Sequence, residues 1–404
     1  MKMKIMINQK ALVEALKTLK PAIDNRQSMP ILSDVLITCG NTAGTPHLIL
    51  ASTNLELSMR YYMPADQYQA DSIGQVIVNL PRFLNVVTRM QSPGESLTLE
   101  HLTQEKVFQV TCGRMVMKMP GIAPEGYPEI RKVPVGSPLR LLIQRKALAD
   151  AINRTLPFVS RDETRINLSG MYTEVLPTSK SMTQGGIIRM VSSDGHVLSL
   201  CEKPAIMRGD IDTKNERVRI IPAAALAAIP KQQKGFISFI YPTEKKDEKN
   251  LLLWITGGNW EMGVRCIEGE FPNYAEVISK DQVGEAVFDP EELLSILSRF
   301  QAMVTSNNRG LKMDIDEGRL TLTYNHPEWG TATESMLVDH MGEPHQTGVS
   351  HTYLTQALKA FVAGERPGED LRVALSFVGE MSPMVMSEEG GGSGIIVIMP
   401  MKIK

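Results

Sequence analysis

Apolar residues recur at helical spacing near the start of the chain. Leu12, Leu16 and Leu19 lie three or four residues apart, and Pro21 follows them. This spacing places the three leucines on one face of a helix, and a proline is typical of a helix end. Residues 10–21 are therefore predicted to contain an amphipathic helix that buries its leucine face.

The same pattern returns twice further along the chain. Residues 146–157 repeat the first helix at an offset of 136, so that Lys146 takes the place of Lys10. A third copy of the pattern lies at 292–300. A repeat at a fixed period indicates one structural unit used several times. We therefore expect three similar domains, and copies that each keep their helices favour a symmetric assembly.

Each copy also contains a second helix and segments with strand pattern. The second helices are expected at 81–90, 222–229 and 351–361. Alternating or short apolar runs predict strands at 47–50, 97–99, 108–110, 251–255, 320–323 and 395–399. The predicted fold is α+β, with domains at 1–135, 136–280 and 281–404 and boundaries near Val135 and Lys280. The glycine-rich segment 387–394 is expected to form a loop and has no assigned role.

Length and composition narrow the class of protein. The 404 residues suffice for three domains that each bury a core. The sequence has no apolar run of 18 residues, and its first 20 residues lack the apolar centre of a signal peptide. The four cysteines (Cys39, Cys112, Cys201 and Cys266) are too far apart in sequence for a zinc ribbon or a redox dithiol. We expect a cytoplasmic protein with reduced thiols and no membrane partner.

Charge is unevenly distributed along the chain. The six helical segments, counted with their flanking residues, carry a total of +8. The whole chain is at −2, so the remaining residues carry −10. If the six helices line one surface, that surface is positive, and duplex nucleic acid is the partner such a surface favours. Ordinary solvated helix faces of mixed charge remain an alternative interpretation.

Motifs of common catalytic chemistry are absent from the sequence. It contains no phosphate-binding loop, no dinucleotide-binding glycine motif and no zinc-protease motif. His196 lacks a nucleophile in a Gly-x-Ser-x-Gly turn, and His340 and His345 are expected in a Gly/Pro-containing loop. We expect no metal and no cofactor. Function by binding or by shape is favoured, and a hydrolase that uses His196 is the weaker alternative.

Several short motifs together carry a family resemblance. They are MPIL at 29–32, RINLSGM at 165–171, SDGHVL at 193–198, EGEFPNY at 268–274 and IMPMK at 398–402. In this order and spacing they resemble the bacterial DNA polymerase III beta subunit, the sliding clamp family. The resemblance extends over all three copies.

The resemblance implies a fold and a function. In the family, two chains of three repeated domains meet head to tail in a closed ring, with helices around the hole and sheets outside. Such a protein is not an enzyme and needs no cofactor. It encircles duplex DNA without reading sequence and tethers the replicative polymerase. The implied partners are duplex DNA, the polymerase III alpha subunit, the clamp loader, other proteins with a clamp-binding motif, and a second copy of the chain.

The expected DNA contacts are basic residues on the helical segments. They are Lys10, Lys17, Arg26, Arg82, Arg89, Lys146, Arg161, Lys231, Lys234 and Lys359. Arg26 and Arg82 match basic positions that the family uses near DNA. The other eight rest on helix placement alone.

The resemblance also implies an apolar pocket for short peptides between the second and third domains. It would involve Leu168, Ser193, Gly195, His196, Leu198, Pro272, Val277, Val397, Ile398, Met399, Pro400 and Met401. Three positions depart from the family. Val197 and Glu276 stand where basic residues are common, and Lys402 stands in place of arginine. The rim of the pocket is therefore expected to be less basic than in the family.

Ring closure is expected to use an edge strand of the first domain and the matching edge of the third. Met117 and Met119 on one side, and Met303 and Val304 on the other, are candidates for this interface. A repeat-built adaptor that binds peptides but never encircles DNA is the main alternative to a ring.

Overall fold

The structure is a computed structural model of the chain. It describes residues 3–24, 29–42, 45–90, 96–130, 132–134, 139–178, 185–209, 218–231, 234–242, 251–278, 282–305, 308–363 and 371–402. Arg26 and the predicted boundaries near Val135 and Lys280 lie outside these residues, so the division into three domains stays a prediction.

The chain forms two compact units. Unit 1 comprises Met1–Leu142, Arg208–Asp210 and Ala224–Cys266, and unit 2 comprises Ile143–Met207, Ile211–Ala223 and Ile267–Lys404. The helices are α1 (Gln9–Leu19) and α2 (Leu80–Arg89) in unit 1, α3 (Arg145–Thr155), α5 (Pro290–Phe300) and α6 (His351–Val362) in unit 2, and α4 (Ala223–Ala227) across both. These bounds confirm all six predicted helices within a few residues. The fourth is shorter than predicted because Pro230 disfavours helix in the residues before it.

Asparagine side chains cap the first turns of the two helices of unit 1, and one face of each helix is buried. The side chain of Asn8 accepts a hydrogen bond from the Ala11 amide at 3.1 Å, which satisfies a free donor at the start of α1. Asn79 does the same for α2 through the Arg82 amide at 3.2 Å. The leucine face predicted for α1 is buried, as are Leu80, Phe83 and Val87 of α2.

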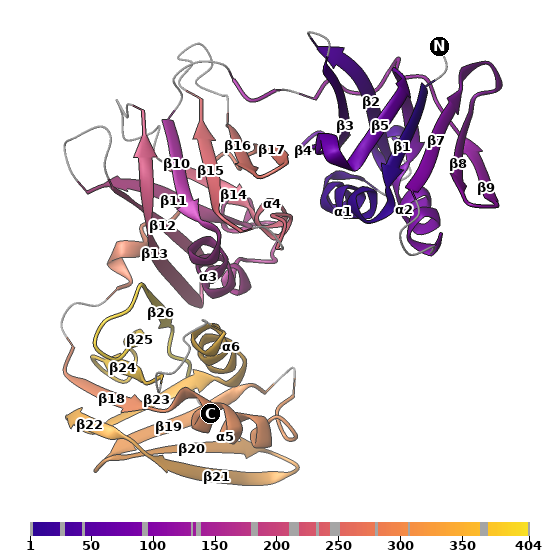
Figure 1. Ribbon diagram of the computed structural model, residues 1–404. Coiled ribbons are helices and arrows are strands. Elements are labelled where there is room, and N and C mark those ends of the chain that lie inside the picture. The colour runs from indigo at the N-terminus through magenta and orange to yellow at the C-terminus, as the bar shows by residue number, and fades with distance from the viewer. Residues whose placement is uncertain are drawn as a thin grey trace. The chain divides into compact units, whose positions relative to one another are not determined.

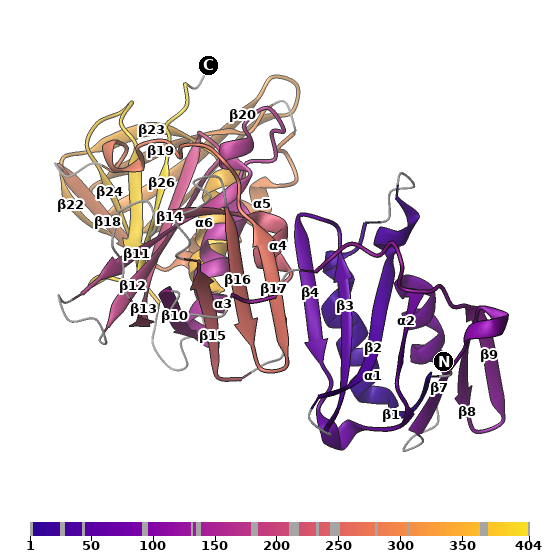
Figure 2. The same cartoon turned by 90° about the horizontal axis from the view of Figure 1, so that it is seen from above.

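Unit 1 contains two antiparallel sheets (Figures 1 and 2). The first runs in the order β5 (Tyr68–Ser72), β1 (Met3–Asn8), β7 (Ser96–Leu102), β8 (Val107–Cys112) and β9 (Met115–Pro120). The second pairs β6 (Gly74–Asn79), β2 (Asp34–Thr42), β3 (Thr45–Thr53), β4 (Leu57–Tyr62), β17 (Trp260–Arg265), β16 (Leu252–Gly257) and β15 (Phe236–Tyr241) in succession. The helices α1 and α2 pack against each other and against this second sheet.

Unit 2 is also built on antiparallel pairings. In succession they join β14 (Val218–Pro222), β11 (Gly170–Pro177), β12 (Gly186–Ser193), β13 (Val197–Arg208), β26 (Gly394–Ile398), β25 (Met384–Glu388), β24 (Val373–Phe377), β18 (Gly284–Phe288) and β22 (Asp339–Gly342). A smaller sheet runs β21 (Gly330–Leu337), β20 (Arg319–His326), β19 (Gly310–Asp316) and β23 (His345–Ser350). Strand β10 (Leu139–Gln144) contains residues of both units.

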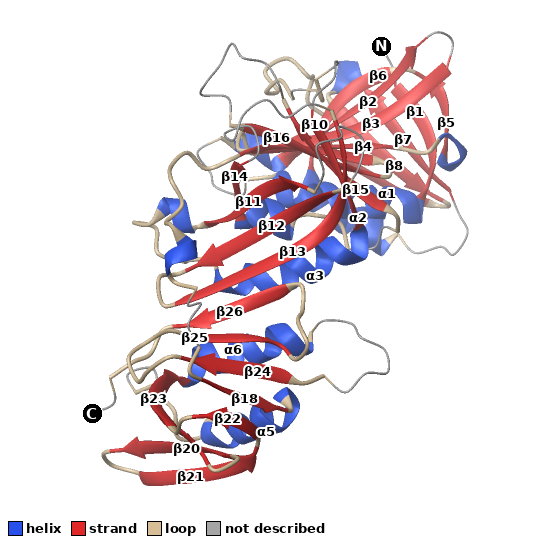
Figure 3. Ribbon diagram, turned by 90° about the vertical axis from the view of Figure 1, so that its left-hand side faces the viewer, coloured by secondary structure: helices blue, strands red, loops and turns tan. Residues whose placement is uncertain are grey.

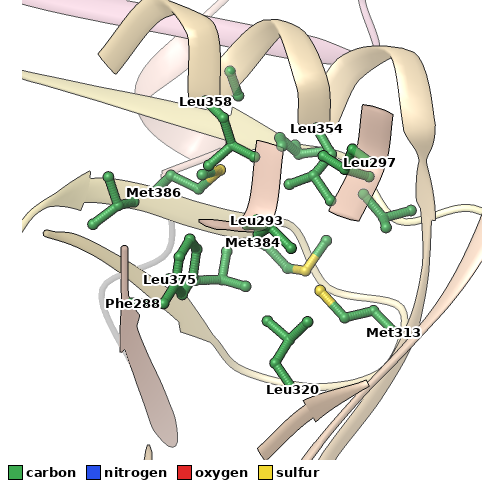
Figure 4. Packing of buried hydrophobic residues seen from close by; sticks show 14 of the residues in the cluster. Phe288, Leu293, Leu297, Met313, Leu320, Leu354, Leu358, Leu375, Met384 and Met386 are labelled. Atoms are coloured by element: carbon green, nitrogen blue, oxygen red, sulfur yellow. The ribbon is translucent and has the colours of Figure 1, made fainter. Parts of the chain in front are cut away.

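The core of unit 2 shows how the helices are held on these sheets. Leu293 and Leu297 of α5 meet Leu354 and Leu358 of α6, and methionines such as Met384 fill the space toward the strands (Figure 4). Burying a side chain of this size contributes roughly 1.5–3 kcal/mol. The packing accounts for part of the high methionine content, because the flexible thioether fills irregular gaps.

Two strand pairings join residues that the sequence assigns to different copies of the repeat. In unit 1, β4 pairs with β17, and the Arg265 amide extends the ladder to the Glu56 carbonyl at 2.9 Å. In unit 2, β13 pairs with β26, and the Met399 amide extends that ladder to the His196 carbonyl at 2.9 Å. Each of the two joints is an antiparallel ladder that one further backbone hydrogen bond extends. Neighbouring copies of the repeat are therefore joined in the same way in both units.

A candidate peptide pocket and basic helix faces

A cavity of about 130 Å³ opens at the end of the β13–β26 ladder in unit 2. Its lining is Leu168, Ser193, Gly195, His196, Val197, Leu198, Phe271, Pro272, Asn273, Tyr274, Val277, Val397 and Met399. Nine of the twelve residues predicted for the peptide pocket therefore surround one cavity. The structure adds Val197, Phe271, Asn273 and Tyr274 to them. Their role in binding stays a prediction.

The other three predicted residues lie elsewhere. Side chains of a strand alternate between its two faces. Because Val397 faces the cavity, its neighbour Ile398 faces the opposite way and is fully buried in the core around α5 and α6. Pro400 and Met401 follow the end of β26 and are half-buried outside the cavity lining.

The turn between β12 and β13 forms one rim of the cavity. One carboxylate oxygen of Asp194 accepts hydrogen bonds from the His196 amide at 2.9 Å and the Val197 amide at 3.0 Å. Gly195 has a φ of 92°, which glycine adopts without steric cost. The Asp-Gly-His motif is therefore a tight turn whose aspartate orders the backbone and whose histidine faces the cavity.

Tyr353 of α6 supports this turn, and the sequence reading missed it. Its hydroxyl donates to the second carboxylate oxygen of Asp194 at 2.7 Å, and its ring stacks on His196 with centroids 6.1 Å apart. Burial, followed by the hydrogen bond to Asp194, raises the pKa of Tyr353 to about 12. No local pattern singles out Tyr353, because its partner is 159 residues away.

The opposite wall of the cavity is the segment that contains Phe271 and Tyr274. Both rings pack on Tyr172 of β11, with centroids 5.2 and 5.7 Å apart. Arg189 of β12 donates to the Tyr274 hydroxyl at 3.1 Å. The Asn167 amide group donates to the Glu270 carbonyl at 2.8 Å. These contacts hold the wall on the sheet, so the cavity is preformed.

Two of the positions at which the sequence departs from the resembled family lie at the rim of the cavity. Val197 lines the cavity with an uncharged side chain. Glu276 is exposed, and its carboxylate accepts a hydrogen bond at 2.6 Å from the side chain of Asn273, which itself lines the cavity. A carboxylate therefore lies beside the opening where a base was common in the resembled family.

The predicted DNA contacts are exposed wherever the structure describes them. They are Lys10 and Lys17 on α1, Arg82 and Arg89 on α2, Lys146 on α3, Lys359 on α6, and Arg161, Lys231 and Lys234 outside these helices. In unit 1 the four cations of α1 and α2 belong to two adjacent helices. They form no ion pair with another described residue and remain open to a polyanion.

The predicted interface residues occupy two different settings. Met117 and Met119 are half-buried on β9, which is the edge of its sheet among the described strands. Met303 and Val304 follow α5 and pack partly against the core of unit 2.

No helix of the described residues is long and apolar enough to cross a membrane. Within the same residues, no three His, Cys, Asp or Glu side chains gather in a way that could hold a metal ion.

The fold and the cavity are those of a repeat-built α+β protein that works by binding. Comparison of the sequence with models of known families identifies its family. Residues 3–131 match the family model described as the DNA polymerase III beta subunit, N-terminal domain. Residues 275–402 match the one described as the C-terminal domain of the same subunit. The chain belongs to the DNA polymerase III beta subunit family, the beta sliding clamps, and is a non-catalytic processivity factor. This excludes the hydrolase hypothesis for His196.

Individual relatives agree over the whole length. The beta sliding clamp of Pseudomonas putida is 24% identical over 400 residues, covering 98% of this chain and 99% of the relative. The beta sliding clamp of Synechococcus elongatus is 24% identical and fully covered on both sides. Among solved structures, the Bacillus subtilis sliding clamp superposes with a TM-score of 0.84 at 19% identity over both complete chains. The α+β clamp fold predicted from the sequence is thereby confirmed.

Proposed function

We propose that two copies of the chain close head to tail into a ring that encircles duplex DNA. The observation that carries this proposal is a pair of unpaired sheet edges. Among the described strands, β9 pairs only with β8, and β21 pairs only with β20. An edge strand presents free amides and carbonyls that can pair with another chain. Pairing β9 of one copy with β21 of the next satisfies both edges twice and closes the ring.

A closed ring holds DNA by topology rather than by affinity. The exposed cations of α1 and α2 attract phosphates without contacting base edges, so the ring slides without sequence preference. Retention then depends on the ring staying closed around a duplex without ends.

The cavity in unit 2 supplies the second half of the function. An apolar cavity with a few polar edges suits the anchoring of a short peptide. A polymerase held there stays near the primer end, because tethering turns each rebinding into an intramolecular event. The alpha subunit of the polymerase, the clamp loader and other clamp-binding proteins are the proposed occupants.

Circular and linear DNA distinguish the ring from an adaptor that does not encircle DNA. A clamp loader that acts on beta sliding clamps loads the protein onto a singly nicked circular plasmid in the presence of ATP. The mixture is then passed through a size-exclusion column. We expect the protein to stay with the circle in about 0.5 M salt, where phosphate contacts are largely screened. Cutting the circle once should release it. Equal loss from the circle and from the linear plasmid would contradict encirclement.

Charge reversal tests the basic helix faces separately. The variant Lys10→Glu/Lys17→Glu/Arg82→Glu should bind linear duplex about tenfold more weakly at low salt, with a shallower salt dependence. Lys106→Glu, on the connection between β7 and β8, is the matched control and should bind like the unaltered protein. A weakening of the same size in both variants would show that the helix faces are not the DNA-facing surface.

Peptide selection tests the cavity. Phage-displayed random peptides are selected on the intact protein and counter-screened against Val277→Glu, which places a charge at the half-buried edge of the cavity. We expect apolar peptides that lose affinity at least about tenfold in this variant, because an apolar anchor cannot pair the added charge. Ile206→Glu changes an exposed apolar residue outside the cavity lining and should have no effect. Peptides indifferent to Val277→Glu would place the binding site elsewhere.

A further inference from the structure

The cavity occupies one end of the ladder between β13 and β26, and a group of charged side chains occupies the other. The register runs from Val197 opposite Ile398 to Cys201 opposite Gly394. Figure 3 shows β12, β13, β26 and β25 side by side in this order. Five consecutive residues of a strand span about 13 Å. The two ends of the ladder are therefore connected by a short stretch of regular sheet.

Four side chains from three elements meet at that second end, and we name them the charge cluster. Arg154 of α3 pairs with Glu388 of β25 at 2.7 Å and with Asp150 of α3 at 2.9 Å. Lys203 of β13 forms an ion pair with the other oxygen of Asp150 and also donates to the Ser393 hydroxyl. Two positive and two negative charges thus connect elements from the second and third copies of the repeat.

The charge cluster is sheltered from water. Only 7% of the Arg154 side chain and 1% of the Glu388 side chain are exposed. The Phe361 ring of α6 lies 5.8 Å from the Arg154 guanidinium. In such a setting an unpaired charge is strongly destabilising, so each member needs its partners in place. The two copies cannot separate here without leaving buried charges uncompensated.

The protonation of these groups agrees with that arrangement. Burial alone would lower the pKa of Arg154, but its hydrogen bonds and ion pairs with Asp150 and Glu388 outweigh burial and raise it. Burial alone would raise the pKa of Asp150, but Lys203 and Arg154 outweigh burial and lower it. Both partners therefore stay charged.

The connection between β25 and β26 at this end of the ladder is rich in glycine. Glu388 ends β25, and the connection to β26 contains Gly390 and Gly391, both with positive φ. Glycine loses more conformational entropy on ordering than any other residue. The ion pair of Glu388 with Arg154 lies on one side of the glycines, and the hydrogen bond from Lys203 to Ser393 lies on the other, so both ends of the connection are held. The Glu202 amide also donates a hydrogen bond to the Ser393 carbonyl at 2.6 Å.

We infer that the charge cluster is a latch that holds β26 against β13 and so keeps the peptide cavity at the other end of the ladder preformed. The cavity part of this inference rests on the proposed function; the latch itself does not. Arg154 and Glu388 are positioning residues in this view, because neither lines the cavity. A peptide bound in the cavity would favour the latched state in return.

The test measures the latch and the cavity independently. Arg154→Met and Glu388→Gln each remove one partner, and hydrogen exchange of the β26 amides is compared with affinity for a fluorescein-labelled peptide selected as described above. We expect about tenfold faster exchange of β26 and about tenfold weaker peptide binding in both single variants. The double variant Arg154→Met/Glu388→Leu, in which apolar contact replaces the ion pair, should recover most of both losses.

Lys312→Met removes an exposed ion pair with Asp314 in the same unit and is the control; it should change neither measurement. Unchanged β26 exchange in both single variants would overturn the latch. Faster exchange with unchanged peptide affinity would overturn its coupling to the cavity. If no peptide binds the unaltered protein, the proposed peptide site fails, while β26 exchange still decides whether the latch exists.

Discussion

His345 opens β23 with its imidazole buried against the Phe377 ring. The ring centroids are 4.1 Å apart and nearly parallel, and the side chain is almost fully shielded from water. Burial lowers the pKa of His345, while the charge of Glu380 acts weakly in the other direction. The folded protein therefore favours the neutral imidazole, and the unfolded chain takes up a proton that the folded one does not.

Replacing His345 by phenylalanine should make stability less dependent on pH. In the natural chain His345 protonates on unfolding, so stability is lost as pH falls from the ordinary histidine value of about 6.5 toward the lower folded value. The loss is at most about 1.4 kcal/mol per pH unit for one proton. Urea titrations of His345→Phe at about pH 7.5 and pH 5.5 should give a smaller difference than the unaltered protein.

Some pH dependence should survive in that variant. His101 is also buried with a lowered pKa, and burial is again the main cause. His326→Phe, at a half-buried histidine outside the core, is the control and should keep the full difference. An unchanged pH difference in His345→Phe would show that the imidazole binds a proton as readily in the folded protein as in the unfolded chain.

Single residues also show where sequence reading of the cavity stops. Met399 and Leu198 were found because they stand in motifs, at 398–402 and 193–198, and both line the cavity. Ile398 stands in the same motif as Met399 but faces the core, which the two-residue alternation of a strand decides once β26 is known. Tyr353 and Arg154 belong to no motif. Their roles arise from contacts with residues more than 150 positions away, which no local pattern encodes.

Element α5 explains an apparent exception in the charge pattern. Its sequence segment is the one helical region with a net negative charge. Two of its acids, Glu291 and Glu292, lie in the first turn, and Asp289 caps the helix by accepting from the Glu291 amide at 2.8 Å. Negative charge there complements the helix dipole. The acids therefore have a structural role, and their charge need not weaken the DNA-facing character of the other helices.

Removing that cap should loosen α5 locally. Asp289→Ala leaves the amide at the start of the helix without its acceptor and should cost about 1 kcal/mol. Asp289→Asn keeps an acceptor oxygen and should cost only about a few tenths of a kcal/mol. Hydrogen exchange of the first-turn amides of α5 measures the difference. Equal protection in the two variants would show that the carboxylate is not the effective cap.

Strand elements were easier to locate than to pair. The segments at 97–99, 108–110 and 320–323 lie within β7, β8 and β20, because alternation identifies a half-buried strand. Pairing partners far apart in sequence, such as β4 with β17 and β13 with β26, depend on how one copy meets the next. The segment 387–394, taken for a loop without a role, proves to contain the end of β25 and the start of β26, and Glu388 and Ser393 in it make the side-chain bonds of the proposed latch.

At the scale of the whole molecule, the two edges β9 and β21 decide between a monomer and a ring. On β9, Met115 and Val116 are exposed large apolar residues, and Leu337 at the end of β21 is 74% exposed. Exposed apolar side chains on unpaired strands invite aggregation unless a partner covers them. A ring made by two copies covers β9 and β21 of each chain, so neither of these two edges stays open for further growth.

Placing charge on β9 should therefore break the assembly without unfolding the chain. The variant Met115→Glu/Val116→Glu changes two exposed side chains, so the monomer keeps its fold, but pairing with another edge would now desolvate two carboxylates. Light scattering should give twice 44.7 kDa for the unaltered protein and 44.7 kDa for the variant. Gln69→Glu on β5, the opposite edge of the same sheet, should leave the dimer intact. A dimer that survives the β9 variant but dissociates with the β5 variant would assign ring closure to the other edge.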